Sequence, residues 1–222
     1  GVIGFPMNGP IGAYPDMYQL TGKKSVGTFG WPEVYNDENI HGYKSIAVPG
    51  TVAGLIEAHK RFGILPLREV VEPAIYLARK GFTPGWFTLY KFANHTAMLK
   101  RYRELGNIFM PDHSLPFGSL DSPHTLRQPD LADTLESIAK HGSDAFYLGD
   151  IAATIVDNIK ANGGILTRKD LEEYRVFSWK DGLQCSYRDK TITVPPYACA
   201  GITTAMTLKL WEDIGLSSYH HN

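Results

Sequence analysis

Hydrophobic residues along most of this chain recur at helical spacing. The pattern predicts helices over 52–62, 67–80, 86–104, 129–141, 149–162 and 200–214, most of them followed by a glycine. Thr51 is a good N-cap for the first of these helices, and Pro73 is expected to begin a new segment after a break in the second. Ile151, Ile155 and Ile159 lie on one stripe, so this helix should bury one face.

Short runs rich in β-branched and aromatic residues predict strands elsewhere. Residues 45–48 read as one strand, and YRVFSW (174–179) as another. LQCSY and TITVP flank Arg188-Asp189-Lys190, which predicts a hairpin. Thr167 to Asp170 is a variant capping box. The first forty-odd residues, rich in glycine and proline, should be loop with short extended pieces, and the segment 109–127 should be a long loop.

The stretch AVPGTVAGL, residues 47–55, has the outline of a phosphate-binding turn. A P-loop needs GxxxxGK[ST], but Gly54 is followed by Leu55-Ile56. A dinucleotide fingerprint needs three glycines, and only Gly50 and Gly54 are present. We therefore favour a packing corner, in which small residues let the helix approach another backbone closely.

No set of residues in the chain makes a complete active site. Asp112-His113-Ser114 has the composition of a catalytic triad, but adjacent residues do not normally converge in the geometry that a triad needs. His220-His221 lacks the spacing of a metal site, and we expect no metal and no cofactor. Asp130 and Asp133 are explained by the helix dipole, and His59 as a partly buried helix residue.

Composition excludes several classes of partner. A net charge of -1 over 222 residues gives no field that would attract nucleic acid, and no apolar run is long enough to span a membrane. Cys185 and Cys199 form neither a disulfide framework nor a zinc motif. The chain begins without Met and in mid-pattern, so we expect 1–222 to be a single-domain fragment of a longer protein. The compartment stays open, with the cytoplasm slightly favoured.

Four strings in fixed order are more specific than any single motif. They are AVPGTVAGL, FGILPLREVVEPAIYLARKGF, QPDLADTLESIAKHGSDAFYLGDIAATIVDNIKANGGILTRKDLEEYRV and VPPYACAGITTAMTLKLWE. This series resembles the large-subunit part of the gamma-glutamyltransferase (gamma-glutamyltranspeptidase) family, and it covers about Tyr43 to Trp211.

The resemblance implies an N-terminal-nucleophile hydrolase with an α+β fold, a four-layer αββα sandwich, to which this chain would supply mainly helices and part of the sheets. In that family a precursor cuts itself, and a Thr at the new N-terminus of a small subunit becomes the nucleophile, with its own α-amine as base. The nucleophile would therefore lie outside this chain, and we expect no catalytic residue within it. The expected partners are this small subunit and a small-molecule amide or gamma-glutamyl substrate.

The chain departs from the family at one substrate-binding position. Glutamyl-specific members carry an Arg in a D-F-R-E-x-A-P-like string, where it pairs with the substrate α-carboxylate. Alignment through Pro10 places Pro6 at that Arg. A proline cannot provide the bidentate contact of a guanidinium, so binding of a free amino-acid head group should weaken. Asn8 is the polar neighbour that could contact a different substrate, although a turn residue is the simpler role.

Three functions remain open. The first is a gamma-glutamyltransferase-like amidohydrolase and acyltransferase whose specificity has drifted from glutathione. The second is an acylase that acts on other amides, such as beta-lactam precursors or amides of small acids. The third is a non-catalytic relative that keeps the sandwich as a scaffold.

Overall fold

The structure is a computed structural model of the 222-residue chain, and it describes all residues except 26–28, 111–113, 116–124, 197–198 and 216–222. Helices dominate the described part. The helices are α1 (Thr51–Phe62), α2 (Leu67–Lys80), α3 (Trp86–Asn94), α4 (Thr96–Arg101), α5 (Arg103–Phe109), α6 (Pro129–His141), α7 (Ser143–Tyr147), α8 (Asp150–Ala161), α9 (Arg168–Glu172) and α10 (Ala200–Ile214), with 3-10 turns at Tyr35–Asp37 and Tyr43–Ser45.

The strands are short and pair two by two. They are β1 (Val2–Gly4), β2 (Leu20–Lys24), β3 (Pro32–Val34), β4 (Phe177–Trp179), β5 (Leu183–Tyr187) and β6 (Lys190–Val194). Each pair is antiparallel: β1 with β4, β2 with β3 and β5 with β6. The β5–β6 hairpin turns at Arg188-Asp189, as the sequence predicts. Among the described residues no larger sheet forms.

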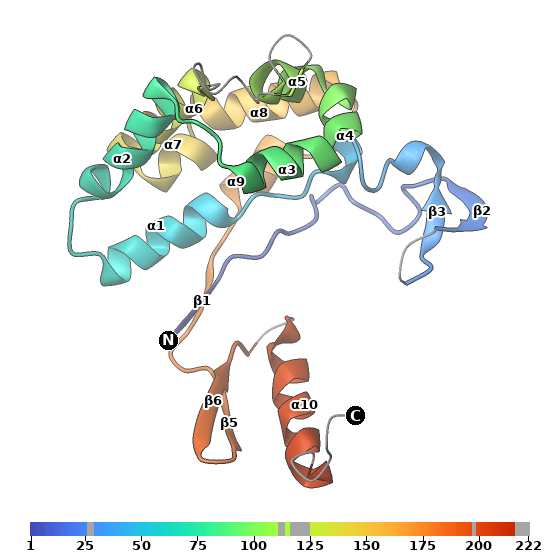
Figure 1. Cartoon of the computed structure of the whole chain (residues 1–222), viewed down its shortest axis with the longest axis vertical. Helices are drawn as coiled ribbons and strands as arrows, with labels where there is room; N and C mark the ends of the chain where they lie inside the picture. The colour runs from blue at the N-terminus through green and yellow to red at the C-terminus, as the bar shows by residue number, and fades with distance from the viewer. Residues whose placement is uncertain (26–28, 111–113, 116–124, 197–198, 216–222) are drawn as a thin grey trace.

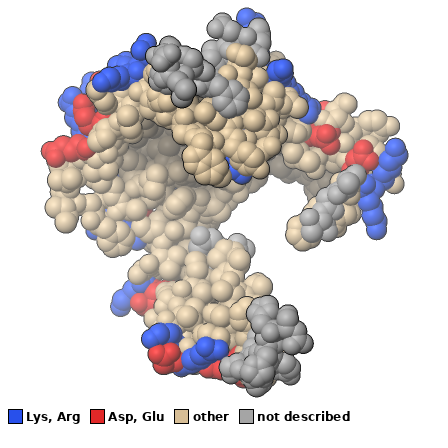
Figure 2. Space-filling model, in the orientation of Figure 1, with Lys and Arg blue, Asp and Glu red and all other residues tan. Residues whose placement is uncertain are grey.

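The chain divides into a helical layer and a smaller unit. Helices α1 to α9 lie together at one end of the molecule, and β5, β6 and α10 form a separate group joined to them through β4 (Figure 1). Figure 2 shows mostly uncharged surface where the two parts face each other. Among the described residues, no helix combines the length and apolar content needed to cross a bilayer.

The main core lies inside the helical layer. Seven buried side chains meet there: Val48, Tyr147, Ala152, Ile159, Leu166, Leu171 and Tyr174. The stripe predicted on α8 is confirmed, since Ile159 is buried and Ile155 packs against the same cluster. A smaller cluster joins α1, α6 and α7 through Ile56, Ile138 and Ala145.

Three predictions about where helices and strands run are wrong. Residues 45–48 do not form a strand: Tyr43–Ser45 is a 3-10 turn, in which the Ser45 hydroxyl donates to the Gly42 carbonyl at 2.8 Å, and only Val48 makes a β-bridge. Pro73 does not break α2. It lies on an exposed face, where water can satisfy the carbonyl that loses its partner.

The third correction concerns residues 86–104. This stretch forms α3, α4 and the start of α5 rather than one helix, with breaks at His95 and Tyr102. Tyr102 has extended backbone angles, which interrupts the helical hydrogen bonding there. The other predicted helices are confirmed, as is the Thr167 capping box.

Candidate functional site

The loop Phe5–Asn8 lies against the corner at Pro49–Gly54. The Val48 N–H donates to the Asn8 carbonyl at 2.8 Å and closes a single antiparallel bridge. A Cβ added at Gly50 would lie 2.6 Å from the Phe5 carbonyl oxygen, and one at Gly54 would lie 2.7 Å from the Phe5 Cβ. Real Cβ atoms do not approach other atoms so closely, so both positions need glycine.

The start of α1 is already occupied by a protein group. The Tyr147 hydroxyl donates to the Pro49 carbonyl at 2.7 Å and accepts from the Ala53 N–H at 3.2 Å. Burial raises the pKa of Tyr147, against a smaller opposing effect of the Ala53 N–H, so the phenol stays protonated and keeps donating. A phosphate at this helix start would need the same N–H. AVPGTVAGL is therefore a packing corner, with Tyr147 in place of the side-chain cap predicted from Thr51, which is itself the first helical residue.

A second tyrosine holds the loop. The Tyr174 hydroxyl donates to the Pro6 carbonyl at 2.8 Å. Its ring stacks on the Tyr147 ring with 5.6 Å between centroids and an interplanar angle of 12°. Both rings belong to the main core. The stacked pair thus connects two surface turns, the loop at Pro6 and the corner at Pro49, to the core.

Asp170 anchors the next turn of the same segment. Its carboxylate accepts from the Ile11 N–H at 2.5 Å, and also from the Thr167 N–H and hydroxyl at 2.7 and 2.5 Å. Burial favours the neutral acid, but the hydrogen bonds from Thr167 and Ile11 together outweigh it and hold the pKa of Asp170 below its usual range. The carboxylate that completes the capping box of α9 therefore also fixes a turn 159 residues away in the sequence.

The two predicted site residues, Pro6 and Asn8, lie two positions apart on this loop. Asn8 is exposed, and its side chain makes no hydrogen bond to a described residue. Pro6 is half-buried, and its carbonyl accepts the hydrogen bond from the Tyr174 hydroxyl. The segment 5–13 contains no cationic side chain, so it cannot pair with a carboxylate as a guanidinium would. It offers an amide, backbone groups and a fixed shape.

The other candidate residues have structural partners or lie outside the described residues. Asp133 pairs with Arg79 of α2 at 2.9 Å, and a ring nitrogen of His59 donates to the Leu65 carbonyl at 2.8 Å. Asp130 is an exposed residue in the first turn of α6. Asp112, His113, His220 and His221 fall outside the described residues. Within the described ranges, no three His, Cys, Asp or Glu side chains cluster as metal ligands.

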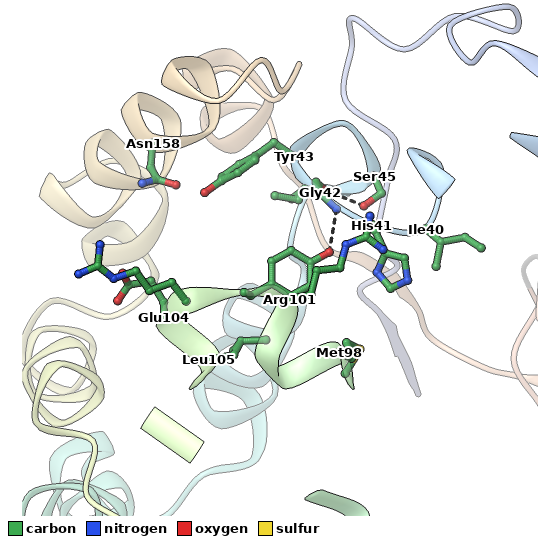
Figure 3. A pocket seen from close by; sticks show the side chains of 13 residues that line it. Ile40, His41, Gly42, Tyr43, Ser45, Met98, Arg101, Glu104, Leu105 and Asn158 are labelled. Atoms are coloured by element: carbon green, nitrogen blue, oxygen red, sulfur yellow. Dashed lines mark hydrogen bonds between the residues drawn. The ribbon is translucent and has the colours of Figure 1, made fainter. Parts of the chain in front are cut away.

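A separate cavity lies elsewhere on the helical layer. It has a volume of about 730 Å³ and lies between residues 40–46 and helices α4 and α5 (Figure 3). The Gly42 N–H donates to the Tyr102 hydroxyl at 3.1 Å, which joins its two walls. The Ser45 hydroxyl donates its hydrogen bond to the Gly42 carbonyl. It is therefore not paired with His41 as a nucleophile would be with a base. No residue of the 5–13 loop lines this cavity.

Reasoning from the sequence did not find the two tyrosines or the second role of Asp170. The capping box was visible because its two partners are three residues apart. The contact from Tyr174 to Pro6 spans 168 residues, and the contact from Tyr147 to Pro49 spans 98. No local pattern carries such a signal.

Comparison with known proteins identifies relatives over most of the chain. The family model described as Gamma-glutamyltranspeptidase matches residues 7–222. The chain is 35% identical over 182 residues to the glutathione hydrolase proenzyme of Pseudomonas aeruginosa, a match that takes in 82% of this chain and 31% of that protein. It is 36% identical over 181 residues to the acylase ACY 1 proenzyme of Pseudomonas sp. strain V22, covering 80% of this chain and 32% of that protein.

Solved structures agree. The crystal structure of Helicobacter pylori gamma-glutamyltranspeptidase superposes with a TM-score of 0.83 and 27% identity, over 99% of this chain and 60% of that chain. The enzyme of Pseudomonas nitroreducens complexed with L-DON gives a TM-score of 0.81 and 28% identity, over 99% of this chain and 61% of that chain. These likenesses confirm the expected α+β fold of N-terminal-nucleophile hydrolase type, with this chain supplying mainly helices and part of the sheets.

The match covers most of this chain but only part of each relative. The chain spans 31% and 32% of the length of the two curated relatives named above. Within that extent the family model runs through almost every residue, from 7 to 222. The chain belongs to the gamma-glutamyltranspeptidase family.

Proposed function

We propose that the longer protein containing this chain is a self-processing amidohydrolase and acyltransferase of gamma-glutamyltransferase type. The observation that carries the proposal is the family match over residues 7–222, together with the TM-score of 0.83 over 99% of the chain. The relatives named above are proenzymes, which supports a precursor that is cut into two subunits. The partner of this chain would then be the small subunit of the same precursor.

The proposed chemistry takes place on a residue outside this chain. A Thr at the N-terminus of the small subunit attacks the substrate amide, releases the amine and forms an acyl-enzyme. Water or a second amine then takes the acyl group. This division explains why the loop 5–13 and its anchors offer shape and a polar contact but no pairing of a nucleophile with a base. We expect residues 1–222 alone to be inactive.

Processing is tested on the full-length precursor. After expression and purification, the proposal expects two bands on a denaturing gel, and N-terminal sequencing of the smaller one should start at Thr. Replacing that Thr by Ala should leave one uncut band without amidase activity. A single uncut chain with no Thr, Ser or Cys at such a junction would favour the scaffold alternative instead.

The substrate is proposed to differ from glutathione. Pro6 occupies the position that the family resemblance gives to an Arg, and proline cannot bind the α-carboxylate of a glutamyl group. A relative named as an acylase, at 36% identity, keeps the acylase alternative open. Asn8 is the exposed polar side chain of this loop, and we assign to it the contact with the acyl head group.

A pair of arginine substitutions tests this assignment. In an extended segment, neighbouring side chains point to opposite faces, so Asn8 and Met7 should present an added charge in different directions. Asn8→Arg is expected to raise kcat/KM for γ-glutamyl-p-nitroanilide relative to butyryl-p-nitroanilide by about tenfold, the effect of one charge-assisted hydrogen bond. The control Met7→Arg should leave this ratio within about twofold. Equal ratios in wild type and Asn8→Arg would show that Asn8 is not in the pocket.

A further inference from the structure

We propose that Tyr174 is a positioning residue for the acyl-donor pocket, and that its hydroxyl sets the orientation in which Pro6–Asn8 face the substrate. The inference rests on the proposed function. It adds a core residue, 168 positions further along the chain than Pro6, to the determinants of substrate specificity. Tyr174 would not touch the substrate; it would act through the Pro6 carbonyl.

The bond from Tyr174 is placed where it controls the loop. The ring of Pro6 fixes its φ angle, so ψ is the main freedom left to this residue. A hydrogen bond to the Pro6 carbonyl fixes ψ as well, because the carbonyl belongs to the rigid peptide plane between Pro6 and Met7. The direction in which Met7 and Asn8 leave this plane is then determined by one phenol.

The loop has a second anchor two residues further on. The Asn8 carbonyl accepts from the Val48 N–H at 2.8 Å, so the short span from Pro6 to Asn8 is held at both ends while the Asn8 side chain stays exposed. The anchor at Asn8 uses backbone and cannot be removed by a simple substitution. The anchor at Pro6 depends on a single side-chain oxygen, so Tyr174→Phe removes it and keeps the ring.

Tyr147 provides a matched control. It is stacked on Tyr174, it is equally buried, and its hydroxyl also donates to a proline carbonyl, that of Pro49, at 2.7 Å. Tyr147→Phe therefore removes the same chemical group from the same ring pair. It affects the start of α1 rather than the loop, so a change common to both variants reports general loosening of the core.

The test uses the full-length, processed protein and three p-nitroanilides, with γ-glutamyl, glutaryl and butyryl groups. For Tyr174→Phe we expect KM for whichever head-group-bearing anilide the wild type prefers to change by about threefold to tenfold. The kcat value and the kinetics on the butyryl anilide should stay within about twofold. The measured ratio is kcat/KM for the preferred head-group-bearing anilide divided by kcat/KM for the butyryl anilide. Tyr147→Phe should leave this ratio at the wild-type level, even if both variants lower the melting temperature equally.

The outcomes separate the two proposals. An active protein in which both variants keep the wild-type ratio, or change it equally, overturns the role of Tyr174 and leaves the proposed function standing. A processed protein that cleaves none of the three anilides and no other amide overturns the proposed function, and the inference about Tyr174 with it. A ratio changed by Tyr174→Phe alone, through KM, supports the inference.

Discussion

The close approach of Phe5 to α1 leads to a quantitative prediction at Gly54. In Gly54→Ala the new Cβ would lie 2.7 Å from the Phe5 Cβ and would overlap the Phe5 ring more closely still. Overpacking of this kind costs about 1–3 kcal/mol. Alanine is also the better helix former, which returns about 1 kcal/mol. We therefore expect Gly54→Ala to lower the free energy of unfolding by about 0–2 kcal/mol, with the short contacts to the ring favouring the upper end.

A second glycine in a helix provides the control. Gly106 lies inside α5, and a Cβ there would find its nearest neighbour, the Leu99 carbonyl oxygen, at 3.5 Å, an ordinary contact. Gly106→Ala should thus stabilise the protein by about 0.5–1 kcal/mol, the helix-propensity difference alone. If the change in free energy of unfolding has opposite signs at the two positions, contact with Phe5, and not helix propensity, decides the effect at Gly54.

The source of the cost is tested with a double-mutant cycle. Removing the ring in Phe5→Ala should reduce the penalty of Gly54→Ala by about 1 kcal/mol, because only the approach of the two Cβ atoms remains. Urea denaturation of the full-length protein measures all four variants. If Gly54→Ala stabilises the protein as Gly106→Ala does, or if the cycle shows no coupling, the conclusion that Phe5 packs closely against α1 at Gly54 is refuted.

Two further predictions concern charged groups. Asp170→Asn should lower the free energy of unfolding at pH 7 by about 1.5–3 kcal/mol, because the donors Ile11 and Thr167 lose a carboxylate. The pKa of Asp170 is depressed by folding, so this contribution is complete above the pKa of the unfolded chain and is lost as pH falls through that of the folded state. Denaturation at pH 7 and pH 3 should show that the difference in free energy of unfolding between wild type and Asp170→Asn is smaller at pH 3. An equal difference at both pH values would contradict this role of the carboxylate. Arg79→Ala should cost under about 1 kcal/mol by urea denaturation, since its pairs with Asp133 and Glu136 are exposed. A loss of 2 kcal/mol or more would mean that these pairs join α2 to α6 more strongly than exposure allows.

What could be predicted from the sequence was local. The helical spacing in α8 and α10, the glycines that end α1, α2, α6 and α10, and the Thr167 capping box involve residues within one or two turns of each other, and the structure confirms them. The hairpin β5–β6 belongs to the same group, since its turn and its paired strands are contiguous. The glycines of the Pro49–Gly54 corner were also assigned correctly to close packing, although the partner that approaches, Phe5, could not be named.

The errors and omissions concern effects that short sequence patterns do not carry. Residues 45–48 have strand composition, but strand formation needs a partner, and only Val48 finds one, at Asn8. Pro73 is a helix breaker by propensity, yet α2 continues through it because its exposed side tolerates the lost hydrogen bond. The tyrosine anchors depend on segments that meet only after folding. The assignment of Pro6 and Asn8 to a substrate site stays a prediction, and the tyrosine that holds their loop could not be named from the sequence.

The last helix shows how a correct local prediction can still lack its explanation within the chain. The apolar residues Ile202, Met206, Leu210 and Ile214 recur every four residues along α10, yet each is 43–61% exposed and no residue of α10 is buried. A two-stranded hairpin beside one helix does not bury enough surface to be stable alone. Because the chain spans about a third of its curated relatives, this stripe supports the proposal that the rest of the precursor packs here. The helical layer, with its own core, would hold the substrate loop, while the hairpin and α10 would gain their stability only from the part that brings the nucleophile.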